Sequence, residues 1–362
     1  MPLRLTARAA DFPAAFDRLV ASARETIARV DSVASAIVED VRRRGDKALH
    51  AYTLKFDRVK LTARSARIPA RDIETAWRKA PKAARAALET AAARIDAFHR
   101  RQLPGRAGWT DALGIRLGWR WTPIEAVGLY VPGGRAAYPS CVLMSAVPAR
   151  VAGVTRLAMV VPTPGGEINQ LVLAAAHLAG IEEIHCIGGA QAIAALAYGT
   201  ASIKPVDKIV GPGNAYVAAA KRQVFGQVGI DSIAGPSEVV IVADGENDPA
   251  WIAADLMAQA EHDPVAQSIL ITDDPRFATR VERAVEALLR RLPRRAIAAA
   301  SWRDHGAVII VDRLADAVAL IDRLAPEHLQ LAIAKPDAFA DRVRHAGAIF
   351  LGRHAPEAIG DY

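Results

Sequence analysis

The chain has 362 residues, enough for two domains, and with 52% hydrophobic and 23% charged residues it has the composition of a globular protein. Its formal charge of +7 is spread along the sequence, which argues against a nucleic-acid partner and favours anionic ligands such as a dinucleotide. The only cysteines, Cys141 and Cys186, argue against a disulfide scaffold and indicate a reducing cytoplasm. No uninterrupted apolar run reaches membrane-spanning length, and the N-terminus lacks a signal-peptide core.

The first 105 residues or so are predicted to be helical. Residues 32–46 carry apolar side chains at helical spacing, with Gly45 as the stop. Residues 73–102 are rich in Ala and Arg and predict a long surface helix that breaks near Pro81. Residues 113–121 alternate loosely and indicate a strand or a hairpin arm.

From Val127 onward, short apolar runs alternate with helical stretches, which predicts parallel sheets covered by helices. The number of runs suggests two sheets. Pro123 and the Gly235-Pro236 turn are the expected crossing points, so residues 1–123 and 237–362 would form one α/β lobe with N-terminal helices, and residues 124–236 a second. The predicted strands are 127–131, 157–161, 184–187, 208–210, 239–242, 268–271, 307–311, 329–333 and 348–351, and the predicted helices are 171–179, 190–197, 215–225 and 249–262.

Glycine-rich turns follow three predicted strands of the second lobe, at residues 132–134, 188–189 and 211–213. The carboxyl ends of strands are where open α/β sheets bind ligands, and backbone N–H groups there can receive phosphate. The sequence has no GxGxxG fingerprint, and the alternative is that these turns are tight connections that need glycine for positive φ.

Two polar pairs are candidate site residues. Gln259 and His262 are three apart at the end of a helix predicted to start after Asp248, and they would share one face as half of a metal site. A histidine that caps the helix is the alternative. Glu327 and His328 precede a strand and could divide acid–base work, or the glutamate could simply be solvated. Cys141 has no adjacent charge pattern to lower its pKa, which favours a structural cysteine over a catalytic thiol.

Seven blocks, taken in order, resemble the histidinol dehydrogenase family from about residue 20 onward. They are VGLYVPGG at 127–134, IGGAQAIAALAYGT at 187–200, VDKIVGPGNAYVAAAK at 206–221, IDSIAGPSEV at 230–239, QAEHD at 259–263, PEHLQL at 326–331 and PEAIGDY at 356–362. Each block alone is a weak signal, but their shared order makes a chance match improbable.

This resemblance implies two incomplete Rossmann-like lobes and a homodimer with shared active sites. It also implies the oxidation of L-histidinol to L-histidine through a bound aldehyde, with two NAD+ used in succession. Gln259, His262 and Asp361 fall on zinc ligands, which also contact substrate. His328 falls on the base that acts on the alcohol, and Glu327 on the residue that activates water for the aldehyde step. The remaining matched positions are Ser237 for substrate, with Glu327 and His328, and Tyr130, Gln191 and Asn214 for the dinucleotide.

The resemblance departs from the family pattern at the end, because family members continue past the Gly-Asp-Tyr block. The segment that follows there carries a fourth zinc ligand, a substrate-contacting glutamate and the arm that exchanges between subunits. We therefore expect the C-terminal dimer-exchange domain to be absent and turnover to be impaired. The alternative function is an inactive fragment or a non-catalytic binding module that retains the fold.

Overall fold

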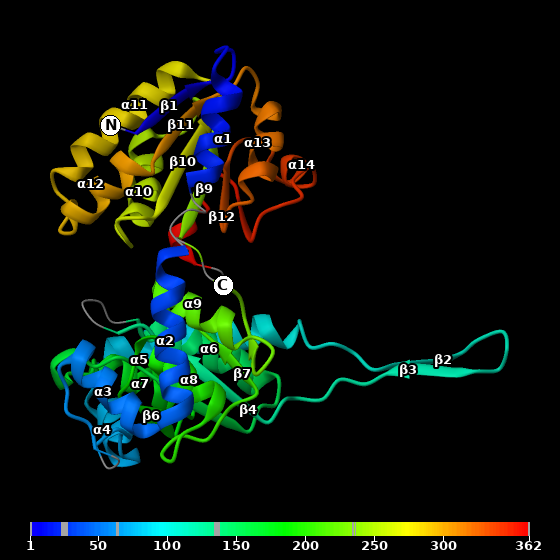
Figure 1. The fold of residues 1–362 in the computed structure, drawn as a ribbon. Helices are drawn as coiled ribbons and strands as arrows, with labels where there is room; N and C mark the ends of the chain where they lie inside the picture. Colours follow the sequence, from blue (N-terminus) through cyan, green and yellow to red (C-terminus); the bar gives the residue numbers. More distant parts are fainter. Residues whose placement is uncertain are drawn as a thin grey trace. The chain divides into compact units, whose positions relative to one another are not determined.

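The computed structural model describes residues 2–22, 28–62, 65–133, 138–233, 235 and 237–360. The chain divides into two compact units (Figure 1). Unit 1 combines Met1–Glu25 with Gly235–Tyr362, and unit 2 is the continuous stretch Thr26–Ala234. The prediction of parallel sheets covered by helices is confirmed in both units.

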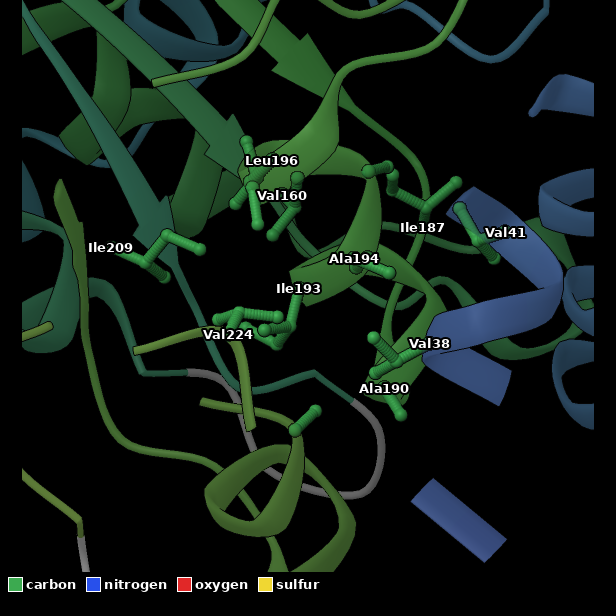
Figure 2. Packing of buried hydrophobic residues seen from close by; sticks show 14 of the residues in the cluster. Val38, Val41, Val160, Ile187, Ala190, Ile193, Ala194, Leu196, Ile209 and Val224 are labelled. Atoms are coloured by element: carbon green, nitrogen blue, oxygen red, sulfur yellow. The ribbon is translucent and has the colours of Figure 1, made fainter. Parts of the chain in front are cut away.

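The predicted boundary at Pro123 is wrong. The helices between residues 28 and 100 belong to unit 2, where Val38 and Val41 share a core with Ile187 and Ala190 of the second sheet's connections (Figure 2). The amphipathic pattern of these helices shows which face is buried but does not identify the surface that buries it. These helices are α2 (Ala28–Arg44), α3 (Asp46–Asp57), α4 (Ala70–Lys79) and α5 (Lys82–Arg100).

Unit 1 is built on a sheet in which six parallel strands are described, in the order β1-β11-β10-β9-β12-β13. Successive residues of β9 enter opposite cores: Val239 and Ile241 pack on one face, Val240 and Val242 on the other. Burial on both faces explains why the strands read as nearly continuous apolar runs. The strands are β1 (Leu3–Thr6), β9 (Glu238–Ala243), β10 (Gln267–Thr272), β11 (Ala307–Ile310), β12 (His328–Ala332) and β13 (Ala348–Leu351).

Helices cover both faces of this sheet. The core on one side draws on α10, α11 and α12, and the core on the other on α1, α13 and α14. Short 3-10 turns, η3 (Leu314–Asp316) and η4 (Glu357–Ile359), complete the unit. The helices are α1 (Phe12–Ser22), α10 (Pro249–Ala260), α11 (Pro275–Leu289), α12 (Arg295–Asp304), α13 (Ala317–Leu324) and α14 (Pro336–Ala340).

Unit 2 holds a parallel sheet with five described strands in the order β6-β5-β4-β7-β8. The order reverses at β4, because β5 and β6 follow on one side of it and β7 and β8 on the other. Gly128 of β4 lets the sheet approach α8 closely, since a Cβ there would lie 2.9 Å from Cδ1 of Leu196. The strands are β4 (Ala126–Tyr130), β5 (Arg156–Val160), β6 (Glu183–His185), β7 (Lys208–Val210) and β8 (Gly229–Ile230).

Two groups of helices surround this second sheet. Helices α2, α3, α8 and α9 pack together, and α4, α5, α6 and α7 form the other group. The predicted break at Pro81 is confirmed, because it separates α4 from α5. The connecting elements are α6 (Pro139–Val151), η2 (Pro164–Gly166), α7 (Gln170–Leu178), α8 (Gly189–Tyr198) and α9 (Ala215–Val224).

An antiparallel hairpin, β2 (Ala107–Thr110) and β3 (Arg116–Trp119), projects from unit 2 (Figure 1). It corresponds to the predicted hairpin arm and presents Trp109 edge-on to Trp119, with ring centroids 5.3 Å apart. In the described residues no helix is both long and apolar enough to cross a membrane.

Candidate active site

Unit 1 gathers several predicted site residues at the amino edge of its sheet. His328 is the first residue of β12 and pairs in register with Val239 of β9, so Glu327 and Ser237 precede adjacent strands. The Ser237 carbonyl also accepts a 3.0 Å hydrogen bond from the Gln267 backbone N–H at the start of β10. Parallel pairing therefore brings Ser237, Glu327 and His328 to one edge.

The carboxylate of Glu327 lies beside Glu238, the first residue of β9. The Glu238 backbone N–H donates to Oε2 of Glu327 over 3.4 Å. Burial, together with the negative charge of Glu327, raises the pKa of the Glu238 carboxyl from 4.5 to about 7. Glu327 itself is exposed, so it can reach water and ligands while its backbone carbonyl is fixed by Ala348.

A carboxylate that the sequence reasoning did not single out stands next to His328. Nδ1 of the imidazole lies 3.3 Å from Oε1 of Glu357, and both side chains are largely buried. Glu357 is held in turn, because its backbone N–H donates to Oε1 of Gln330, whose Nε2 donates to Asp255. Glu357 lies in the PEAIGDY block at 356–362, and this position is the sequence feature that could have identified it.

The imidazole is also placed by packing, since its ring meets Phe350 of β13 at a 67° interplanar angle with centroids 6.0 Å apart. A buried carboxylate on one ring nitrogen orients the ring and favours its protonated form after it takes a proton. With Glu327 adjacent, this edge holds an imidazole that can take up a proton and a carboxylate that can reach water.

The predicted helix that carries Gln259 and His262 ends earlier than expected. Helix α10 stops at Ala260, and His262 follows in a turn where its N–H donates to the Gln259 carbonyl. Asp248 caps the start of this helix as predicted. Gln259 is buried and its Nε2 lacks a hydrogen-bond partner among the described residues, whereas His262 is exposed.

Asp361, the third predicted zinc ligand, lies outside the described residues. Within the described ranges, no group of three or more His, Cys, Asp or Glu side chains is arranged to hold a metal ion. The amide of Gln259 nevertheless suits a cation, because the oxygen and nitrogen of an amide are assigned by hydrogen bonding. Its unpartnered buried end could present the oxygen, and with the His262 imidazole it offers the N/O donors that zinc accepts.

Unit 2 gathers the predicted dinucleotide residues at the carboxyl edge of its sheet. Tyr130 ends β4, and its hydroxyl accepts a 3.1 Å hydrogen bond from the Gly189 N–H at the start of α8. Burial raises the pKa of Tyr130 to about 12, so the phenol stays protonated. Gln191 is also buried, and Asn214 caps α9 by accepting from the N–H groups of Tyr216 and Val217.

The turn after β7 is held from both sides by an ion pair between the buried Lys221 and the more exposed Asp231. Nζ of Lys221 donates to the Gly211 carbonyl over 3.0 Å and pairs with Asp231, while Asp231 accepts the Gly211 N–H over 2.7 Å. Gly211 has φ of +113°, and a Cβ there would lie 2.1 Å from the Tyr130 carbonyl oxygen. Sequence reasoning found the glycines but not Lys221, which is 2% exposed.

Cys141 lies in the first turn of α6, and burial raises the pKa of its thiol. A raised pKa suppresses the nucleophilic thiolate, in agreement with a structural cysteine. Both cysteines are free thiols.

Comparison with known proteins agrees with this arrangement. The histidinol dehydrogenase family model matches residues 20–362. The chain is 65% identical to the histidinol dehydrogenase of Rhodospirillum rubrum and 60% identical to that of Ruegeria pomeroyi, covering all of this chain and 84% of each relative. The crystal structure of histidinol dehydrogenase from Elizabethkingia anophelis superposes with a TM-score of 0.92 at 35% identity, covering 100% of this chain and 82% of that one.

A family match over nearly the whole chain, a relative with 65% identity and a common fold point to one conclusion. The chain belongs to the histidinol dehydrogenase family and is an NAD-dependent oxidoreductase.

Proposed function

We propose that this chain oxidises L-histidinol to L-histidine in two steps, each reducing one NAD+. The observation that carries the proposal is the His328 imidazole beside the Glu357 carboxylate, with Glu327 next to it, at the amino edge of the unit 1 sheet. Family membership supplies the substrate, and this pair supplies the chemistry that an alcohol oxidation needs.

In the first step, His328 takes the hydroxyl proton while the carbinol hydrogen leaves as hydride to NAD+, which gives the aldehyde and NADH. In the second, Glu327 takes a proton from water as the water oxygen bonds to the aldehyde carbon. The aldehyde oxygen gains a proton to complete the hydrate. The hydrate then loses a hydride to a second NAD+ and two protons to the site's bases and solvent, which gives the carboxylate. Ser237 would contact the substrate, together with Glu327 and His328.

The dinucleotide would bind at the carboxyl edge of the unit 2 sheet, near Tyr130, Gln191 and Asn214. The start of α8 supports this, because helix N-termini favour anions. The turn at Gly211 supports it as well, because its backbone packs directly against the Tyr130 carbonyl at the end of β4. The order reversal at β4 marks the kind of crevice that binds nucleotides in open α/β sheets.

We further propose a zinc ion held by Gln259, His262 and Asp361, which also contact substrate. Such an ion, when bound, supplies an orienting charge for the imidazole and amine of the substrate. The chain's own contribution is to bury the Gln259 amide at the end of α10 and to place His262 in the turn after it.

A homodimer and a cytoplasmic location complete the proposal. Free cysteines suit a reducing compartment. Trp109 and Trp119 of the hairpin are 46% and 53% exposed, and a two-stranded hairpin is marginally stable by itself in water. A second copy of the chain is the partner that we propose for it, and light scattering on the purified protein tests this. A monomer at micromolar concentration would contradict it.

Histidinol-dependent NADH formation, with zinc present, tests the function. We expect two NADH per histidine formed, and a loss of turnover in His328→Asn without a loss of NAD binding. NAD binding with no turnover in the unmodified protein would instead support a non-catalytic binding module.

A further inference from the structure

The sheet of unit 2 follows the strand order of half of a dinucleotide-binding fold. With β4 as the first strand, β5 and β6 are the second and third, and β7 begins the return on the other side. In such folds an acidic side chain at the end of the second strand accepts hydrogen bonds from the adenosine ribose of NAD. Here β5 is followed by Val161-Pro162-Thr163-Pro164, and the next acid, Glu167, is exposed.

Asp57 supplies a carboxylate to this region from a different part of the chain. It is the last residue of α3, a helix that packs against both η2, which follows β5, and α8. The negative charge of Asp57 contributes to the raised pKa of Tyr130, which places the carboxylate near the hydroxyl at the end of β4. Asp57 therefore belongs to a helix that packs beside the segment after the second strand, and its charge acts on the residue that ends the first strand.

One oxygen of the buried Asp57 carboxylate lacks a hydrogen-bond donor among the described residues. Its side chain is 9% exposed, and Oδ2 has no partner among the described residues. Oε1 of Gln191, on a side chain that is 1% exposed, is also unpartnered and lies over Gly189, where a Cβ would meet it at 2.7 Å. A buried carboxylate oxygen and a buried amide end, both unpartnered near Tyr130, suit a ligand that donates hydrogen bonds.

The position of Asp57 is also unfavourable for the helix that carries it. A negative charge at the C-terminal end of a helix opposes the helix dipole, and burial raises the pKa of this carboxyl. Groups that lower stability in this way are characteristic of ligand sites.

We propose that the Asp57 carboxylate accepts hydrogen bonds from the ribose diol of the adenosine half of the dinucleotide, and thereby selects NAD over NADP. The inference rests on the proposed binding of the dinucleotide at this edge. A ribose diol supplies two donors, whereas the 2′-phosphate of NADP replaces one donor with negative charge next to the carboxylate. Gln191 provides a second acceptor to the same ligand.

The test compares Asp57→Asn with Asp72→Asn, an exposed carboxylate on α4 that serves as the control. Calorimetry would measure the Kd of NAD and of NADP for each protein. We expect D57N to lower the preference for NAD by about tenfold or more, through weaker NAD binding and tighter NADP binding. The KM for histidinol should not change, and D72N should match the unmodified protein.

The melting temperature separates a ligand site from a structural role. D57N removes a buried, unpartnered charge from a helix end, so we expect its Tm to be unchanged or higher. A lower Tm with equal weakening of both dinucleotides would overturn the inference, as would an unchanged preference.

A second measurement needs no variant. The unmodified protein should bind 2′-deoxy-NAD about tenfold more weakly than NAD, because a donor to Asp57 is lost. Equal binding of the two would overturn the inference while leaving the proposed cofactor site intact. Failure to bind either NAD or NADP would instead contradict the proposed site itself, and the inference with it.

Discussion

The imidazole of His328 and the carboxylate of Glu357 form a pair with Nδ1 and Oε1 3.3 Å apart, although the two residues come from a strand and a 3-10 turn. The pair belongs to a chain of contacts that continues through Gln330 to Asp255 on α10. One ring nitrogen of His328 therefore faces a fixed partner, which holds the imidazole in one orientation.

Replacing Glu357 with Gln should lower kcat by roughly ten- to a hundredfold, because the imidazole loses the charge that stabilises its protonated form. The KM for NAD should stay the same, since the residues proposed to bind the cofactor lie in unit 2. Steady-state kinetics would check both. Glu167→Gln, which changes an exposed glutamate, is the control. An unchanged kcat in E357Q would show that Glu357 does not act through His328.

Replacing Lys221 with Met should weaken NAD binding by about tenfold, because the Gly211 turn loses a hydrogen bond and Asp231 loses its buried partner. The KM for histidinol should remain unchanged. Arg222→Met is the matched control on the same helix, since Arg222 pairs with Asp31 at a half-exposed site where an ion pair contributes little. If K221M lowers stability but leaves the Kd for NAD unchanged, the ion pair is structural only.

The raised pKa of Glu238 should make the thermal stability of the protein depend on pH between 4.5 and about 7. Its folded pKa of about 7 lies above the ordinary 4.5, so between these values the folded protein binds the proton more tightly than the unfolded chain does. The stability that the protonated carboxyl contributes is present at low pH and is lost as the pH rises through this window. Glu238→Gln, which stays neutral, should therefore gain Tm relative to the unmodified protein at pH 8 but not at pH 4.5.

Thermal unfolding at several pH values would measure this difference, with Glu89→Gln, an exposed glutamate on α5, as the control. A Tm difference between E238Q and the unmodified protein that is the same at both ends of the window would show that the carboxyl does not titrate there.

Replacing Gly211 should lower the free energy of unfolding more than replacing another glycine with a similar φ. Gly211→Ala combines φ of +113° with a Cβ 2.1 Å from the Tyr130 carbonyl oxygen, and should destabilise by about 3 kcal/mol. Gly226→Ala has φ of +101° but open space around the Cβ, and should cost about 1 kcal/mol. Urea denaturation of both variants would separate the cost of the steric contact at Gly211 from the cost of the positive φ that both positions share. Equal losses in the free energy of unfolding would contradict the close approach to Tyr130.

The sequence predicted the buried strands well because β-branched runs that are covered on both faces, such as β9 and β10, leave little ambiguity. It missed β1, whose four residues are mostly exposed and whose pairing with β11 joins distant parts of the chain. Amphipathic helices such as α2 were found, but their partners were not, because a stripe of apolar residues does not identify the surface it covers.

The candidate site shows the same limit. Glu327 and His328 were found because they stand together before a strand. Glu357 was not, because its contact with His328 depends on a turn that only the folded chain brings back to β12. Asp57 and Lys221 were missed for the same reason. The charge of Asp57 acts on Tyr130, which is distant in sequence, and Lys221 bonds to the Gly211 turn outside its own helix.

The pairing of β1 with β11 has a consequence for synthesis on the ribosome. Unit 2 is one continuous stretch, so it can fold as soon as its last residues emerge. Leu3, by contrast, must wait for Ala307 before its strand can join the sheet. Strand β1 is therefore synthesised early but joins its sheet late. Because β1 is short and has a polar face, it is less prone to non-native strand pairing before β11 is available.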